Sequence, residues 1–230
     1  MSKRNCTMFS IALLAMTALI SSAQASTVNT SISTGSITTL TGFAGANIES
    51  FDGVTPGTYS SPVTLGNTTY SVNTGTSFHI DGDYANQYNT TNDSLHNCYC
   101  GDSFGQVKFS FSQPVGAIGF HWGASDSVWT LSAYNASNVL LESFALPVTS
   151  ASNSGNFVGL VDAGIKYAFL TGASSDYVLV DDFATTVSGG PSTVPLPAGV
   201  PLFGSALLIL GVTSWYRRRQ QHTHGGGNLA

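Results

Sequence analysis

Charged side chains are scarce in this sequence, and basic ones are almost absent from its middle. Asp, Glu, Lys and Arg make up 8% of the 230 residues, about a third of the share found in ordinary soluble domains. Residues 26–190 contain twelve acidic residues, two lysines and no arginine, which leaves a net charge of −10. A protein that binds nucleic acid needs a basic surface that displaces counterions from phosphate. The sequence therefore predicts no nucleic-acid partner.

Two familiar catalytic signatures are also missing. The chain contains neither a His-Glu-x-x-His sequence nor a Gly-rich phosphate loop, the patterns of many metalloproteases and nucleotide-binding enzymes. Acids, histidines and serines that a hydrolase needs are present, but their spacing singles out no pair. We therefore predict that the protein is not an enzyme, and a secreted hydrolase is the third and last of our alternatives.

The N-terminus has the pattern of a secretory signal peptide. Lys3 and Arg4 precede an apolar run over residues 8–20, and Ala23-x-Ala25 follows it. A basic start, a short apolar segment and a site of small residues are typical of such peptides. We expect a signal helix within residues 1–25 and cleavage after Ala25. A membrane anchor that is never cut is the alternative.

The C-terminal region has the pattern of a transmembrane helix. Residues 198–216 are 19 positions without a charge, followed by Arg217, Arg218 and Arg219. As a helix they would span about 28 Å, close to the hydrocarbon thickness of about 30 Å. Basic flanks stay cytoplasmic, so we expect the domain outside and the tail, residues 220–230, inside. A buried core helix is the alternative.

A proline-containing motif stands directly before this helix, in the sequence Val194, Pro195, Leu196, Pro197, Ala198. The order of motif, helix and arginines over residues 194–219 resembles the bacterial PEP-CTERM sorting signal in its Val-Pro-Leu-Pro-Ala variant. The same region is also known as an ice-binding-protein C-terminal domain. The resemblance implies a substrate of an exosortase, a membrane protease that cuts near the motif. The tail after the arginines is longer than such signals usually have.

The middle of the chain has the composition and pattern of strands. Residues 26–190 contain 24 Ser and 20 Thr but only four Lys or Glu, whereas solvated helices need long charged residues. Apolar residues alternate with polar ones over residues 107–112, 118–122 and 129–134, as in half-buried strands. This alternation predicts that Trp122 and Trp129 fill the core. Short runs between turn sequences predict an antiparallel, jelly-roll-like β-sandwich over residues 26–184, of about eight to ten strands. Residues 185–193 are expected to be a flexible linker.

One polar segment, residues 81–105, lacks strand periodicity. Ordered loops longer than about 12–15 residues are often functional. Because aromatic rings stack on sugars, its tyrosines, Tyr84, Tyr88 and Tyr99, are our candidate ligand-binding residues. Cys98 and Cys100 lie here too, and in an oxidising compartment we favour a bridge between them. Two free thiols or bridges to another chain are the alternatives.

Acidic residues near the start and end of the predicted sandwich are candidates for a structural calcium site. The closing strand with Asp181 and Asp182 resembles the last strand of many exported β-sandwich modules. In some carbohydrate-binding modules of that shape, an acid there and an early Glu share Ca²⁺, which implies Glu49 as the partner. Carboxylate oxygens are the ligands that Ca²⁺ prefers. The alternative is a strand end that turns both carboxylates into solvent.

Together these patterns predict an exported, non-enzymatic domain. It is first tethered to the inner membrane and then delivered to the cell surface or the extracellular matrix. Its expected partners are the secretion machinery, the membrane and an exosortase-like protease. The alternative function is a carbohydrate-binding module at the cell surface, with extracellular polysaccharide as its partner.

Overall fold

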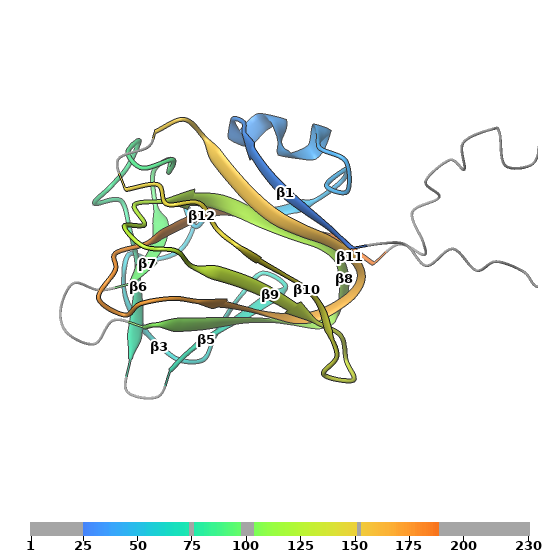
Figure 1. Ribbon diagram of the computed structural model, residues 1–230. Coiled ribbons are helices and arrows are strands. Elements are labelled where there is room, and N and C mark those ends of the chain that lie inside the picture. The colour runs from blue at the N-terminus through green and yellow to red at the C-terminus, as the bar shows by residue number, and fades with distance from the viewer. Residues whose placement is uncertain (1–24, 74–75, 98–103, 151–152, 189–230) are drawn as a thin grey trace, which may run out of the picture. The chain divides into compact units, whose positions relative to one another are not determined.

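The computed structural model describes residues 25–73, 76–97, 104–150 and 153–188 (Figure 1). The chain divides into two units, residues 1–188 and 189–230, and every strand of the described residues belongs to the first. The expected signal peptide up to residue 24, Cys98, Tyr99, Cys100, the expected sorting motif and the expected membrane helix lie outside the described residues. Within those described, no helix is long and apolar enough to cross a membrane.

The described chain is all-β and antiparallel, as the sequence predicts. Twelve strands and one short 3-10 helix, η1 (Thr34–Thr39), follow one another. The strands are β1 (Ser26–Ser31), β2 (Asn47–Glu49), β3 (Gly57–Ser60), β4 (Val63–Leu65), β5 (Thr68–Val72), β6 (Ser77–Asp81), β7 (Ser94–Asn97), β8 (Gln106–Gly123), β9 (Thr130–Tyr134), β10 (Leu140–Ala145), β11 (Asn156–Thr171) and β12 (Leu179–Val187).

Two long neighbouring strands, β8 and β11, form the centre of the sheet, whose main order is β10-β9-β11-β8-β12-β7-β6-β3 (Figure 1). The first half of β8 pairs with β5 and its second half with β12, while β11 lies along the other side. The alternation predicts separate strands before and after Pro114, but the structure has one strand of 18 residues. Irregular register around Val115 and Ile165 lets such a strand bend instead of ending.

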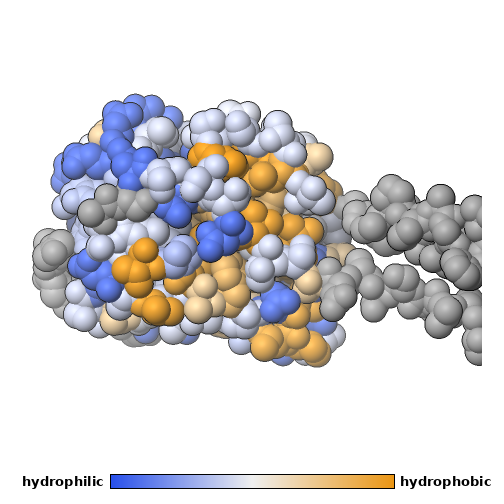
Figure 2. Space-filling model, turned by 45° about the horizontal axis from the view of Figure 1, so that its top comes forward, coloured by the Kyte–Doolittle hydropathy of each residue, from blue (hydrophilic) through white to orange (hydrophobic). Residues whose placement is uncertain are grey.

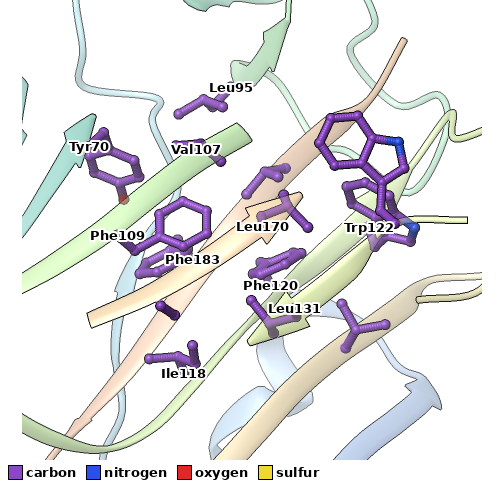
Figure 3. Packing of buried hydrophobic residues seen from close by; sticks show 14 of the residues in the cluster. Tyr70, Leu95, Val107, Phe109, Ile118, Phe120, Trp122, Leu131, Leu170 and Phe183 are labelled. Atoms are coloured by element: carbon purple, nitrogen blue, oxygen red, sulfur yellow. The ribbon is translucent and has the colours of Figure 1, made fainter. Parts of the chain in front are cut away.

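The main core lies on one face of these strands. Alternate β8 residues are buried there, including Phe109, Phe120 and Trp122, and Trp129 joins them. Figure 3 shows Phe109, Phe120 and Phe183 grouped together, with ring centroids 4.7 Å apart for Phe109 and Phe183. The expectation that both tryptophans fill the core is confirmed, since each is 0% exposed.

The opposite face of β8 is also covered, which the alternation alone does not show. Residues 32–46 pack over it and form a second cluster that includes Ile37, Phe43 and Phe157, and Figure 1 shows β1 and η1 beside β11. Gly119 lies under this layer, where a Cβ would come within 2.8 Å of the Phe43 ring. The second half of β8, residues 117–123, is therefore buried on both faces, whereas Ser112 and Gln113 in the middle of the strand are exposed.

Three predictions about the strands need correction. The segment predicted to lack strands, residues 81–105, contains β7, whose four residues are all buried but too few to show a period. Strand β12 continues to Val187, so Thr185 and Thr186 belong to the sheet and not to the expected linker. Strands of only three or four residues, such as β2, β3 and β4, raise the number above the expected eight to ten.

Candidate functional site

Aromatic side chains from four parts of the chain meet at one end of the sheet. Strand β6 supplies His79, the connection between β6 and β7 supplies Tyr84 and Tyr88, β7 supplies His96, and Tyr177 lies two residues before β12. The ring centroids of Tyr84 lie 5.1 Å from Tyr177 and 5.8 Å from Tyr88, and those of His96 and His79 are 5.5 Å apart. We call these five residues the tyrosine cluster. Its three tyrosines are all partly exposed.

The connection that carries Tyr84 and Tyr88 is held firmly against the sheet. The Asn89 side chain donates to the carbonyl of Trp122 (2.8 Å) and accepts from the amide of Gly155 (2.7 Å). The Thr90 hydroxyl donates to the carbonyl of Tyr84 (2.9 Å). Gly123 lets this segment approach, because a Cβ there would lie 1.7 Å from the Tyr88 carbonyl oxygen. The two rings are therefore positioned before any ligand arrives.

A hydrogen-bonded chain runs through the cluster. With its proton on Nε2, His96 donates to Asp81 Oδ1 (3.0 Å), and its Nδ1 accepts from the Tyr177 hydroxyl (2.8 Å). Burial raises the pKa of Asp81, but hydrogen bonds from Asp83 and His96 outweigh it and hold that pKa below its usual value. Burial, Tyr84 and nearby carboxylates raise the pKa of Tyr177. Its phenol therefore stays protonated and acts as a hydrogen-bond donor.

Figure 2 shows the surface over one face of the domain. The most hydrophilic residues gather at the left of that view, the side on which Figure 1 places the connection between β6 and β7. Hydrophobic residues form separate patches on this face, one of them at the lower left. The connection that carries Tyr84 and Tyr88 consists mostly of polar residues, so an aromatic group there can contact a hydrated ligand.

The structure brings together two of the three tyrosines selected from the sequence. Tyr84 and Tyr88 lie in the cluster, and Tyr99 lies outside the described residues. Sequence reasoning missed Tyr177, His79 and His96, which lie on or next to strands and carry no local pattern of a site. Only the pairing of β6 with β7 and of β7 with β12 places these residues beside the connection that carries Tyr84 and Tyr88.

The first expected calcium ligand on the closing strand, Asp181, is fully buried and already hydrogen-bonded. Its Oδ2 accepts from the Thr91 amide (2.7 Å) and hydroxyl (3.2 Å), and its Oδ1 accepts from the Asp182 amide (2.7 Å). Burial, together with the charge of Asp182, raises its pKa to about 7. Asp181 therefore ties the connection between β6 and β7 to β12.

Asp182 faces the other side of the sheet. Its Oδ2 accepts from His121 Nδ1 (2.9 Å) and from the Thr34 hydroxyl, while His121 Nε2 donates to the carbonyl of Ile32 (3.0 Å). Burial lowers the pKa of His121, but these hydrogen bonds outweigh it and raise the pKa above its usual value. Both ring nitrogens donate, so His121 is an imidazolium that joins residues 32–34 to β12.

Asp181 and Asp182 face opposite sides of the sheet, and both are buried because both sides are covered at this point. Strand β12 is also irregular between Asp181 and Ala184, with a left-handed φ of 49° at Asp182. The alternative that they turn into solvent is wrong, since they are 0% and 1% exposed. Glu49 lies on the neighbouring strand β2, where its Oε1 accepts from the Phe51 amide (3.3 Å). Among the described residues, no three His, Cys, Asp or Glu side chains converge as a metal site requires.

Sequence reasoning also overlooked one catalytic pattern. Residues 101–105 read Gly-Asp-Ser-Phe-Gly, the spacing of a nucleophile elbow, which needs a turn from a strand into a helix. Only Phe104 and Gly105 of this sequence are described, and Phe104 is fully buried just before β8. The pattern is thus followed by a strand, which is not the context of an elbow.

A hollow lies away from the tyrosine cluster. It has a volume of about 230 Å³ and is lined by the middle of β8, the end of β12 and uncharged side chains that include Asn47, Asn67 and Gln113. None of the residues selected from the sequence lies in it. This hollow therefore adds nothing to the predicted sites.

No family model matches the chain, and no curated protein matches it. Among solved structures, the catalytic domain of a GH87 α-1,3-glucanase is 16% identical, over 66% of this chain and 30% of that one, with a TM-score of 0.33. Tailspike protein 4 of bacteriophage CBA120 is 11% identical, over 60% and 20%, with a TM-score of 0.27. The chain thus spans less than a third of either protein.

A DUF4465 family protein from Bacteroides ovatus ATCC 8483 is 12% identical over 71% of this chain and 99% of that one. Its TM-score is 0.25. Similarities this low carry no argument about function. The argument for function therefore depends on the residues of this chain.

Proposed function

We propose that this protein is an exported, non-catalytic β-sandwich domain that binds extracellular polysaccharide through the tyrosine cluster. The observation that carries the proposal is the convergence of Tyr84, Tyr88 and Tyr177 on a firmly held, partly exposed surface. Carbohydrate sites combine apolar ring faces with a few well-placed hydrogen-bonding groups. Here the hydroxyls of the tyrosines and the imidazoles of His79 and His96 supply the polar part.

Binding without catalysis fits the chemistry of this cluster. A glycoside hydrolase needs two carboxyl groups on opposite sides of the scissile bond. The two carboxylates that act on Tyr177, Asp81 and Asp83, are only two residues apart in the chain, and Asp81 is already hydrogen-bonded to His96. The raised pKa of Tyr177 keeps its hydroxyl protonated and so makes it a poor nucleophile. A rigid arrangement of hydrogen-bond donors and ring faces suits recognition, because little conformational entropy is lost when a ligand binds.

Export and sorting complete the proposal. The signal peptide would bring the domain through the inner membrane, and the helix at residues 198–216 would hold it there. An exosortase-like protease would then cut near Pro195 and Pro197, whose rings keep the backbone extended for a protease groove. The domain would reach the cell surface or extracellular matrix, where polysaccharide is available.

The binding proposal is tested by pull-down on a panel of insoluble polysaccharides. Truncating an anchor residue in an interface typically costs about 1–2 kcal/mol or more, so Tyr84→Ala and Tyr88→Ala should each weaken retention about tenfold. Tyr134→Ala is the matched control, because Tyr134 stacks on Tyr167 outside the cluster. Equal retention of all three variants and the unaltered protein would overturn the proposal.

The sorting proposal is tested in cells that contain an exosortase. Replacing both Pro195 and Pro197 by Ala should leave uncut protein in the membrane fraction. Pro191→Ala, just before the motif, should be processed normally. Immunoblots of membrane, surface and medium fractions distinguish the outcomes, and unchanged release of the double variant would contradict the sorting assignment.

A further inference from the structure

Carboxylates surround the polar side of the tyrosine cluster. The Asp83 amide donates to Asp81 Oδ1 (3.1 Å), and the charges of both aspartates act on Tyr177. Asp93 lies next to them, because a Cβ at Gly82 would be 3.0 Å from Asp93 Oδ1. Asp52 follows, with Oδ1 accepting from the Asp93 amide (3.3 Å). Asp81 and Asp83 therefore act directly on the cluster, and Asp93 and Asp52 continue the row of carboxylates away from Asp81 and Asp83.

No lysine or arginine of the described residues balances this charge. These residues contain two lysines, and both are engaged elsewhere. Lys108 Nζ lies 4.3 Å from the centroid of the Tyr167 ring. Lys166 Nζ donates to the carbonyls of Phe111 (2.6 Å) and Ser112 (2.8 Å). Among the described residues, the carboxylates beside the tyrosine cluster are therefore offset only by the imidazoles of His79 and His96, which act on Asp81.

A negative surface with exposed rings discriminates among polysaccharides by their charge. Uronate or sulfate groups would be repelled by the carboxylates, and a neutral sugar would gain no binding free energy from them. An ammonium group would gain binding free energy from two sources, because it is attracted by a carboxylate and by the face of a tyrosine ring. The combination of rings and acids thus favours a cationic sugar.

We infer that the polysaccharide bound by the tyrosine cluster carries free amino groups, as a polymer of glucosamine does. This inference rests on the proposed function and adds the chemical class of the ligand. Tyr84, Tyr88 and Tyr177 contact the sugar rings, and Asp83, Asp81 and Asp93 attract the ammonium groups along the polymer.

The test is titration calorimetry of the full chain in mild detergent with two probes of equal length. One is a glucosamine hexasaccharide and the other an N-acetylglucosamine hexasaccharide, which has no basic nitrogen. At about pH 6, where the amines are protonated, the amino sugar should bind about tenfold more tightly, equivalent to about 1.4 kcal/mol. Added salt should reduce that advantage, because exposed charges are screened.

Charge variants separate specific recognition from general attraction to an acidic protein. Asp83→Asn should weaken binding of the amino sugar about two- to fivefold, in the range of an exposed ion pair. Asp162→Asn is the matched control, because its charge interacts with Glu142 on other strands, and it should change binding less than twofold. Equal losses in the two variants would overturn the inference.

Failure of the inference is distinguishable from failure of the proposed function. If both hexasaccharides bind equally and Tyr84→Ala weakens both, the cluster binds sugar but does not select amines. If neither hexasaccharide binds, the inference is wrong. The proposed function fails only when retention on the whole polysaccharide panel does not depend on Tyr84.

Discussion

Replacing Asp181 by Asn should change how the stability of the domain depends on pH. Asp181 is fully buried beside Asp182, and burial with that neighbouring charge raises its pKa from 3.8 to about 7. A carboxyl whose pKa is raised on folding favours the folded state when protonated. Its contribution is fully present below about pH 4 and is lost as the pH rises through about 7.

The magnitude follows from linkage. Each unit of pKa shift corresponds to about 1.4 kcal/mol, so the change from 3.8 to about 7 amounts to about 4 kcal/mol in alkaline solution. Between about pH 5 and pH 8 the contribution of Asp181 to the free energy of unfolding falls by about 2–3 kcal/mol. The amide that Asp181→Asn introduces cannot ionise, and it keeps one of the two acceptor oxygens at a pH-independent cost of about 1 kcal/mol.

Urea unfolding followed by tryptophan fluorescence measures the free energy of unfolding at both pH values. Between about pH 5 and pH 8 the stability of Asp181→Asn relative to the unaltered protein should rise by about 2–3 kcal/mol. Asp83→Asn, which removes an exposed carboxylate, should follow the unaltered protein. The raised pKa of His121 contributes a loss in the same direction in the unaltered protein and in Asp83→Asn, and a smaller one in Asp181→Asn, because the charge of Asp181 helps to raise that pKa. Parallel stability curves for Asp181→Asn and the unaltered protein would refute the reasoning.

Two further substitutions probe the tertiary structure. The Asp176 carboxylate accepts from the Asp126 amide, the Ser127 amide and hydroxyl, and Trp129 Nε1, so Asp176→Ala should cost about 3 kcal/mol or more in urea unfolding. Burial raises the pKa of Asp176, but these hydrogen bonds hold it below 3.8. Its stabilisation is therefore lost only as the pH falls below about 4, whereas Asp176→Ala should lack this acid-dependent loss. Gly123→Ala places a Cβ 1.7 Å from the Tyr88 carbonyl oxygen, so it should displace that segment and reduce polysaccharide retention about as much as Tyr84→Ala. Gly53→Ala, with nothing within 4 Å, should bind normally, and normal retention by Gly123→Ala would contradict this account of the loop.

Local patterns in the sequence determined the fold class and much of the core. Alternation along residues 107–112 and 118–122 correctly predicts strand structure and the burial of Phe109, Phe120 and Trp122. This succeeds because a strand's side chains alternate between faces, so neighbouring positions reveal which face is buried. The signal peptide and the sorting signal are likewise contiguous patterns, and they stay predictions of the sequence.

The tertiary structure alone decided where the site lies and what the two closing aspartates do. Tyr84 and Tyr177 are neighbours because β7 pairs with both β6 and β12, and no local period reports such a pairing. Alternation requires Asp181 and Asp182 to face opposite sides, but it does not reveal that both sides are covered. That outcome depends on Thr91 and His121, which are distant in sequence and lie within hydrogen-bonding distance only after the strands have paired.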